Sequence, residues 1–566
     1  MKELTVIDFF CGAGGFSEGF RQQGFKILMG IDNWEPAIKT FNHNFKLECK
    51  SKSVLDFENS IDEIEALPDT DVIIGSPPCV TFSTSNKSGK ADKSLGVRLT
   101  EVFLRIVAVK KHKPNSTLKA WFMENVTNSV NYLNDYYTFK DLNLSNWARK
   151  HNISPSKIAI ILKDNQPEIN SSNYGSPQSR IRVISGEIVK HGKLVIPPNT
   201  HQPAEAKGNL QKYITLRDIR NSLPSPNSKK SDSLTTDPLY PSIRIKISEL
   251  SDHFYDTGLY ECEWKQSMFL KTNHPYMGRM SFPENENKPS RTITATKIGS
   301  SREAIVYLSE YKRKGNGEYR TPTIRESATL MGFPITYQFV GSETAKCRLV
   351  GNAVCPSVSK AFAKLVRKEL GLNTIKKDLV QTTPDLTGVN NLNTFSPKVF
   401  EKPPKRNKGS RFRRHPFKDG NLTITLSNYD ITKNERKGSK WITSIQYGNG
   451  EGFPVHNYPN GFYKKLEPII AAYKNGKKFL HTINNGFSEK IGNKWELQEM
   501  YENQKSNGKL LEPSKLIEEV ARIINNLKID NEEYIQKESN VFKEKHVVPL
   551  KQLYALYAIN KISSNT

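Results

Sequence analysis

A short apolar strand that stops at two prolines and a cysteine constrains the fold more than any other feature. Residues 72–74, Val-Ile-Ile, have the pattern of a buried parallel strand. Residues 75–78, Gly-Ser-Pro-Pro, end this strand abruptly, and Cys79 follows. Open α/β sheets place their ligands at the carboxyl ends of strands. The pattern therefore positions the Cys79 thiol as a nucleophile, whereas a cysteine considered alone is more often a small buried side chain.

The N-terminal residues indicate a nucleotide-binding unit of Rossmann type. A strand over residues 4–10 runs into the glycine-rich segment 11–15 and then into a helix. A second strand over residues 26–31 ends at Asp32, which is placed to hold ribose hydroxyls, and residues 53–56 are a third candidate strand. The glycine spacing is not G-x-G-x-x-G, which argues against a pyrophosphate. These features favour an adenosine-containing ligand such as S-adenosylmethionine.

Charged residues follow two further strand-like segments. The apolar residues 118–123 deliver Glu124 to a sheet end. Gln178, Arg180 and Arg182 alternate, so on a strand they share one face. Two guanidinium groups on one face suit an anionic target, either a phosphate or a carboxylate.

Six sequence blocks, taken in order, resemble the motifs of the DNA (cytosine-5) methyltransferases of bacterial and phage restriction-modification systems. The resemblance covers roughly residues 1–370 and leaves an extra C-terminal region. The blocks are residues 8–15 (Asp-Phe-Phe-Cys-Gly-Ala-Gly-Gly), 75–83 (Gly-Ser-Pro-Pro-Cys-Val-Thr-Phe-Ser), 124–126 (Glu-Asn-Val), 178–182 (Gln-Ser-Arg-Ile-Arg), 325–326 (Arg-Glu) with 332–334 (Gly-Phe-Pro), and 351–354 (Gly-Asn-Ala-Val). The fold that it implies is an α/β, Rossmann-like methyltransferase domain that uses S-adenosylmethionine, with a smaller target recognition domain.

The resemblance implies a role for each catalytic residue. A thiolate that adds to carbon 6 of cytosine turns the ring into an enamine, whose carbon 5 attacks the methyl group of S-adenosylmethionine, and Cys79 is the implied nucleophile. The Glu124 carboxyl group contacts ring nitrogen 3 and the exocyclic amine, so it must be protonated and we expect a raised pKa. Arg182 contacts the ring oxygen and steadies the glutamate, while Arg180 works near the DNA backbone.

The same resemblance implies the cofactor-binding positions. They are Phe10, Gly12, Ala13, Gly14, Asp32, Asp56, Pro78, Asn352 and Val354. Two positions depart from the family pattern. Val80 stands where the family usually has Gln, which puts a loop hydrogen bond and turnover in doubt. Asn33 stands where an aromatic residue often follows the ribose-binding acid, and Trp34 comes next, so stacking of Trp34 on adenine stays open.

Double-stranded DNA is the expected partner. The net charge of +25 and the pI near 9.5 suit a polyanion. A cytosine stacked in a duplex cannot be reached by a thiol, so the base must be flipped out. The polar, basic residues 84–93 predict a lid that closes on the DNA. The candidate DNA contacts are Ser83, Lys87, Arg279, Arg291 and Thr292.

The length of the chain predicts several domains. They are a first catalytic part (1–186), a target recognition region (187–320), a return to the catalytic domain (321–370) that includes a closing helix, a flexible basic linker (371–415) and a C-terminal accessory domain (416–566).

The accessory domain is expected to be α+β. Residues 421–426 and 441–447 alternate like strands, and the apolar residues between 516 and 527 lie on one helical face after Pro513. From residue 401 to the end, 29 Lys and Arg face 18 Asp and Glu. We interpret this part as a DNA-binding or recognition module, with a fused restriction nuclease as the alternative.

Other readings of the whole chain stay open at this point. An RNA cytosine methyltransferase would keep the same cysteine and glutamate, and a catalytically impaired fold could serve as a DNA-binding regulator. Six cysteines without paired spacing favour neither a disulfide framework nor a metal site. A nucleophilic thiol and the lack of a membrane-length apolar run favour the reducing cytoplasm. The resemblance implies a bacterial or phage protein. We expect a monomer, with any cognate restriction endonuclease acting separately.

Overall fold

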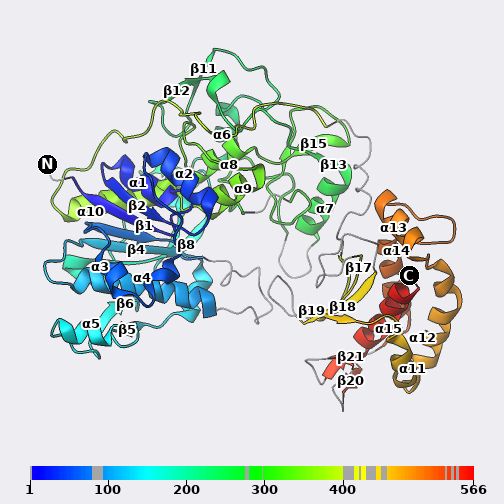
Figure 1. Ribbon diagram of the computed structural model, residues 1–566. Helices are drawn as coiled ribbons and strands as arrows, with labels where there is room; N and C mark the ends of the chain where they lie inside the picture. Colours follow the sequence, from blue (N-terminus) through cyan, green and yellow to red (C-terminus); the bar gives the residue numbers. More distant parts are fainter. Residues whose placement is uncertain are drawn as a thin grey trace. The chain divides into compact units, whose positions relative to one another are not determined.

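The computed structural model divides the chain into two compact units (Figure 1). The first unit comprises residues 1–83 and 93–403, and the second contains residues 404–566. The structure describes residues 3–78, 94–273, 279–295, 298–398, 414–419, 422–428, 441–447, 455–529, 532–536, 541–542 and 547–565. Within these ranges no helix combines the length and the apolar character needed to cross a bilayer.

A six-stranded sheet with the order β2-β1-β3-β4-β8-β7 forms the centre of the first unit. The first four strands of this order are parallel, and β8 runs antiparallel to both of its neighbours. The strands are β1 (Thr5–Phe9), β2 (Lys26–Ile31), β3 (Val72–Gly75), β4 (Ala120–Asn125), β7 (Glu168–Asn170) and β8 (Ile181–Ile188). The strands predicted near residues 4–10, 26–31 and 72–74 are therefore confirmed.

Both faces of this sheet are covered by helices (Figure 1). Val6, Ile74 and Phe122 lie in one apolar cluster with residues of α1 (Gly15–Gln22) and α10 (Pro356–Glu369). Their neighbours in sequence, such as Ile73 and Trp121, lie in a second cluster with residues of α4 (Ser94–His112). Burial on both faces explains why these strands are continuously apolar.

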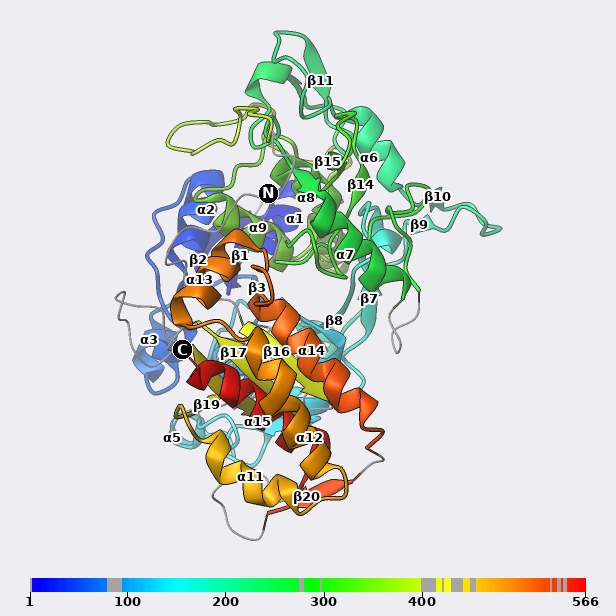
Figure 2. The ribbon, with the colours of Figure 1, turned by 90° about the vertical axis from the view of Figure 1, so that its right-hand side faces the viewer.

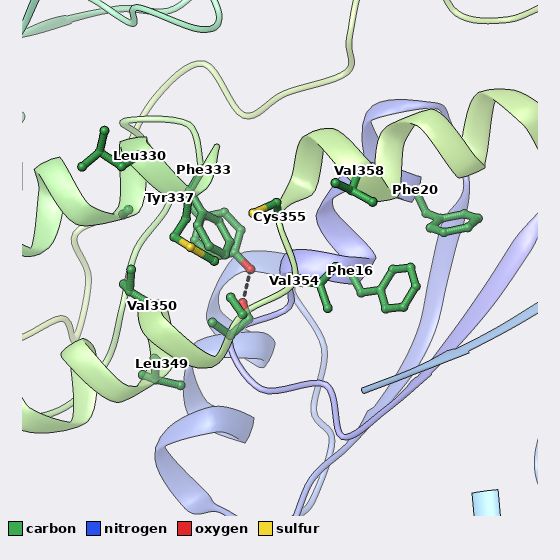
Figure 3. Packing of buried hydrophobic residues seen from close by; sticks show 14 of the residues in the cluster. Phe16, Phe20, Leu330, Phe333, Tyr337, Leu349, Val350, Val354, Cys355 and Val358 are labelled. Carbon is green, nitrogen blue, oxygen red and sulfur yellow. Dashed lines mark hydrogen bonds between the residues drawn. The ribbon is translucent and has the colours of Figure 1, made fainter. Parts of the chain in front are cut away.

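The N-terminal helix α1 and the late helix α10 pack backbone against backbone (Figure 3). A Cβ atom on Gly19 would lie 2.4 Å from the backbone nitrogen of Lys360 and 2.5 Å from the carbonyl oxygen of Pro356. The Ser359 hydroxyl donates a hydrogen bond to the carbonyl oxygen of Phe16. The last part of the catalytic fold is thereby joined to its first helix.

The predicted target recognition region, called the recognition lobe below, lies in sequence between β8 and α8, and it consists of short elements with long connections. Its strands are β9 (His201–Gln202), β10 (Gln211–Lys212), β11 (Leu234–Thr236), β12 (Arg244–Lys246), β13 (Gly258–Tyr260), β14 (Tyr307–Leu308) and β15 (Asn316–Arg320), and its helices are α6 (Leu216–Ser222) and α7 (Glu261–Thr272). The chain then returns through α8 (Ile324–Met331) and α9 (Glu343–Asn352) to α10. Elsewhere in the unit lie α2 (Glu35–Phe45), α3 (Ile61–Glu65), β5 (Tyr136–Thr138), α5 (Ser145–Lys150) and β6 (Ile158–Ile161).

Two local expectations from the sequence are wrong. The candidate strand at residues 53–56 is a 3-10 helix, η1 (Val54–Phe57), because the Ser53 hydroxyl accepts a hydrogen bond from the backbone N–H of Leu55 and starts a turn. The prediction of a flexible linker over residues 371–415 is also wrong for residues 371–398. This segment lies along the first unit, where Asp252 accepts hydrogen bonds from the Lys346 ammonium and from the backbone N–H of Leu392.

The second unit combines an antiparallel sheet with helices (Figure 2). Its sheet has the order β16-β17-β18-β19, and α15 packs between this sheet and the outer helices. The elements are β16 (Arg414–Asp419), β17 (Leu422–Ser427), β18 (Ile442–Tyr447), β19 (Val455–Tyr458), α11 (Tyr463–Ala471), α12 (Gly476–Thr482), α13 (Lys494–Asn503), α14 (Pro513–Asn526), β20 (Glu533–Ile535), β21 (Val547–Pro549) and α15 (Leu550–Ser564). The two strands and the helix after Pro513 that the sequence predicts are present.

The contact between α1 and α10 can be tested with Gly19→Ala. Helix propensity alone would make alanine the better residue by about 1 kcal/mol. Overpacking against backbone atoms costs about 1–3 kcal/mol, and these neighbours cannot move aside as a side chain can. We expect a lower free energy of unfolding, measured with urea. Lys39→Ala on the exposed side of α2 is the control, and equal stability of Gly19→Ala and the wild type would contradict the close contact.

Candidate active site

Glu124, Arg180 and Arg182 come together at one pocket. Glu124 lies near the carboxyl end of β4, and the neighbouring antiparallel strand β8 brings Arg182 beside it. The Nε atom of Arg182 lies 3.2 Å from Oε1 of Glu124. The space between the lining atoms amounts to about 250 Å³, part of which is open to solvent. Its lining residues are Glu124, Ile169, Ser171, Arg180, Arg182, Ile184, Val354, Cys355 and Val358.

Burial favours the protonated form of the Glu124 carboxyl group. Its residue is 7% exposed, and burial raises the pKa of this carboxyl above its ordinary value. The guanidinium groups of Arg182 and Arg180 oppose the shift without cancelling it. The expected rise of the Glu124 pKa agrees with this direction. A buried, protonatable carboxyl beside a cation can give a proton to a bound base and then be stabilised as the anion.

Arg180 connects this pocket to the recognition lobe. Its Nη1 atom donates to the carbonyl oxygen of Ile293 at 3.2 Å, and the backbone N–H of Ile293 donates to Oε1 of Gln178 at 2.8 Å. The Thr292 hydroxyl donates to the carbonyl oxygen of Ser179 at 3.3 Å. Sequence reasoning missed this connection, because nothing in the pattern of residues 178–182 names a partner more than 100 positions away.

The turn after β3 lies at the same edge of the sheet as Glu124. The Ser76 hydroxyl donates to the carbonyl oxygen of Phe10, and its backbone N–H donates to that of Phe9. The side-chain amide of Asn125 donates to the carbonyl oxygen of Pro77 at 3.5 Å. The turn is therefore tied to the ends of β1 and β4. The predicted nucleophile Cys79 is the second residue after Pro77, and it lies outside the described residues.

The glycine loop and Asp32 form a second cluster at this edge. Phe10 and Gly12 have positive φ angles of 55° and 51°. One Asp32 oxygen accepts the backbone N–H of Gly12 at 3.0 Å, and the other accepts that of Trp34 at 2.9 Å. Burial raises the pKa of Asp32, and these two N–H groups oppose the rise. A Cβ atom on Gly12 would meet only the Phe10 carbonyl oxygen, at 3.9 Å, so the loop leaves room for a ligand.

The remaining predicted cofactor positions differ in burial. Ala13 and Val354 are buried, and the carbonyl oxygen of Ala13 accepts the Tyr337 hydroxyl (Figure 3). Asn352 is exposed at the end of α9, and Pro78 and Asp56 are exposed as well. Gly14 has a left-handed conformation, and it precedes α1 as its N-cap residue.

Trp34 contacts α9, which carries Asn352 at its end. The guanidinium carbon of Arg348 lies 4.5 Å from the centre of the Trp34 ring. The aromatic side chain is therefore already in contact with a cation on one side.

The candidate DNA contacts separate into three groups. Ser83 and Lys87, together with the predicted lid at residues 84–93, lie outside the described residues. Arg279 is exposed. Arg291 forms a bidentate pair with Glu284, and its guanidinium also donates to the carbonyl oxygen of Ala304 at 3.2 Å. This arrangement commits Arg291 to holding the recognition lobe together.

Asp8 is a buried acid near the end of β1. The sequence predicts it only as part of a motif and gives it no role of its own. It is fully buried, and its Oδ2 accepts the Ser17 hydroxyl at 2.7 Å. Burial raises the pKa of Asp8 to about 8, against the effect of that hydrogen bond. Its other oxygen, Oδ1, has no hydrogen-bond partner in the described structure. A protonated side chain under the glycine loop is the consequence at neutral pH.

This fold and site define an α/β enzyme whose parallel strands present acids and a glycine loop at one edge. The sequence profile described as C-5 cytosine-specific DNA methylase matches residues 4–368. The chain therefore belongs to this family, and it is a DNA (cytosine-5) methyltransferase, as the sequence predicts.

Individual relatives match a similar share of the chain. Type II methyltransferase M.HgiDI of Herpetosiphon aurantiacus is 27% identical over 396 residues, which are 67% of this chain and 99% of the relative. Type II methyltransferase M.MthTI of Methanothermobacter thermautotrophicus is 26% identical over 371 residues, 65% of this chain and 98% of the relative. Among solved structures, methyltransferase EhMeth of Entamoeba histolytica has 18% identity and a TM-score of 0.38, and the match covers 65% of this chain and 99% of that one.

The pKa of Asp8 makes a prediction about stability. The folded state keeps this proton up to about pH 8, whereas the unfolded chain loses it near pH 4. Between these values the folded state binds more protons, so this group lowers the free energy of unfolding as pH rises. Asp8→Asn removes that component, so its stability relative to the wild type should improve from about pH 5 to about pH 8 in urea unfolding.

Asp141→Asn is the matched control for this measurement. Asp141 is exposed, and hydrogen bonds from Thr138 lower its pKa. Its carboxylate is therefore ionised throughout the tested range in both the folded and the unfolded chain, so its difference from the wild type should stay constant with pH. Parallel pH curves for Asp8→Asn and the wild type would contradict a protonated Asp8.

Proposed function

We propose that the first unit transfers a methyl group from S-adenosylmethionine to carbon 5 of a cytosine that is flipped out of a short, specific duplex sequence. The observation that carries this proposal is the buried Glu124 paired with the half-buried Arg182, beside a glycine loop at the same sheet edge. A carboxyl group whose pKa is raised by burial and a guanidinium beside it match the edge of a neutral cytosine ring.

The residues around the glycine loop fit S-adenosylmethionine. Gly12 leaves open space where a side chain would stand, and the Asp32 carboxylate faces the loop from the end of β2. We assign the ribose hydroxyls to Asp32 and the rest of the ligand to the backbone of residues 10–14, with Asp56, Pro78, Asn352 and Val354 completing the set. When bound there, this cofactor supplies an electrophilic methyl group.

Four side chains of the protein each carry out one part of the reaction. The Cys79 thiolate adds to carbon 6, and the Glu124 carboxyl gives its proton to ring nitrogen 3, which neutralises the charge that develops on the ring. Arg182 holds the Glu124 carboxylate that results and the ring oxygen. Arg180 keeps the pocket aligned with the recognition lobe through Ile293. A water molecule takes the carbon 5 proton, the thiolate leaves carbon 6, and ring nitrogen 3 returns its proton to Glu124, which restores the aromatic ring.

The division of labour along the chain is part of the proposal. Residues 1–186 and 321–370 carry out catalysis, and residues 187–320 read the DNA sequence. Ser83, Lys87 and Arg279 are proposed DNA contacts, together with Thr292. Relatives named type II methyltransferases support a role in protecting host DNA within a restriction-modification system.

Base-resolution methylation mapping tests the reaction. DNA from cells that express the chain should carry 5-methylcytosine in one short motif. Cys79→Ala should abolish the signal, and Glu124→Gln should lower the rate by about 100-fold or more, because general acid catalysis contributes about 10²–10⁴. Asn146→Ala, an exposed change on α5, is the control. Methylation that persists in Cys79→Ala would refute the covalent route.

The pH dependence of kcat/KM tests the proton on Glu124. Activity should fall at high pH as this carboxyl ionises, and at low pH as the thiolate is lost. Arg182 lowers the pKa of Glu124. Arg182→Gln should therefore reduce the maximal rate and also move the descending limb to higher pH. Arg149→Gln, which changes an exposed arginine on α5, should leave the limb in place, and an unmoved limb in Arg182→Gln would rule out Glu124 as its origin.

A further inference from the structure

The outer helices α11 and α12 of the second unit carry a concentrated positive charge, which we call the lysine surface. The side of α11 that carries Leu466 and Ile470 is buried, as is Phe479 of α12. The exposed lysines of this region are Lys464, Lys465, Lys474, Lys477 and Lys478. The family match ends at residue 368, so this surface lies outside the part of the chain that the methylase family accounts for.

The charge of the lysine surface is not neutralised within the described part of the unit. The ion pairs there are Lys490–Glu519, Lys515–Glu518 and Arg522–Glu519, and all of them involve α14 or the turn before α13. None of the five lysines takes part. The one acid of residues 461–487 is Glu467, whose carboxylate accepts the Tyr557 hydroxyl at 2.8 Å.

Charge is also distributed unevenly along this unit. Residues 461–487 contain five lysines and one glutamate, whereas residues 488–533 contain seven basic and ten acidic residues. Solubility alone would not require the basic and acidic residues to be separated along the chain. Like charges that stand on adjoining helices repel one another within a Debye length of about 8–10 Å, so the arrangement costs stability unless an anion covers it.

We propose that the lysine surface binds the phosphate backbone of duplex DNA outside the base pairs read by the recognition lobe. DNA is the favoured polyanion because the first unit of the same chain belongs to a DNA methylase family, and a tether raises the local concentration of a second binding site. Lysine ammonium groups on flexible stems make phosphate contacts that carry no sequence information. This inference rests on family membership, not on the catalytic roles proposed above.

The test compares two charge-matched variants of the full chain. Lys474→Gln/Lys477→Gln/Lys478→Gln removes three charges from the lysine surface. The control removes three exposed lysines from other parts of the same unit, Lys418→Gln/Lys505→Gln/Lys509→Gln. Binding to a duplex that contains the methylation motif is measured by fluorescence anisotropy over a range of salt concentrations.

Each lost phosphate contact reduces the slope of log K against log salt by about 0.9. We therefore expect the slope of the surface variant to fall by about 2–3 and its affinity at low salt to drop by about tenfold or more. The control should lose less than about one unit of slope. The methylation rate at saturating DNA should match the wild type in both variants.

Three outcomes would overturn the proposal. They are an unchanged slope in the surface variant, an equal loss in both variants, and a loss of RNA duplex binding with unchanged DNA binding. Thermal unfolding at the wild-type temperature shows that the fold is intact, and Lys464→Gln/Lys465→Gln on α11 gives an independent second variant. Absence of methylation in the wild type would refute the methyl transfer proposed above. The salt slopes would then be read on a duplex of arbitrary sequence, because phosphate contacts carry no sequence information.

Discussion

The approach of α1 to the junction between α9 and α10 is the constraint on which both halves of the site depend. A Cβ atom on Gly15 would lie 2.2 Å from the carbonyl oxygen of Val354, so the backbone of the junction touches the helix that the glycine loop starts. The side chains of Val354 and Cys355 line the pocket of Glu124. One stretch of backbone thus separates the glycine loop from the target pocket. Packed backbone is difficult to deform, so the two sites keep a fixed spacing.

Buried ionisable groups at the site serve two different purposes. Glu124 has a cation at hydrogen-bonding distance, which opposes the rise of its pKa that burial causes. At Asp8 the opposition comes from the hydroxyl and the backbone of Ser17, and a pKa raised to about 8 favours the neutral form at neutral pH. The difference lies in the neighbours and not in the depth, because both groups are buried. Neutral Asp8 adds no negative charge beneath the loop that Asp32 already faces.

Sequence alone predicts the catalytic sheet well, for a physical reason. Buried parallel strands must be apolar on both faces, so residues 72–74 stand out against any polar background. The strand-end positions of Asp32 and Glu124 follow from the same pattern. Residues 53–56 show the limit, because a strand of four residues and a capped turn have the same composition, and only the Ser53 hydrogen bond decides between them.

Partners distant in the chain are the part that sequence could not supply. Arginine is a residue type that often reads base edges, so the sequence makes Arg291 a candidate DNA contact. Only the fold shows that its guanidinium is paired with Glu284. The segment 371–398 is polar and lacks periodicity, so it resembles a tether, yet single hydrogen bonds such as that from Leu392 to Asp252 hold it in place. The role of Gln178 is likewise visible only in the fold, where its side-chain oxygen accepts the backbone N–H of Ile293.

The net charge of the chain is informative only when the positions of the charged residues are known. A total of +25 describes many proteins that never bind nucleic acid. Among the described residues of the second unit, the lysines of some helices pair with glutamates and those of α11 and α12 do not. Paired charges hold a surface together, and unpaired charges attract a counter-ion. A sequence-independent hold on DNA would lengthen each encounter while the recognition lobe searches for its motif, because phosphate contacts are alike at every base pair.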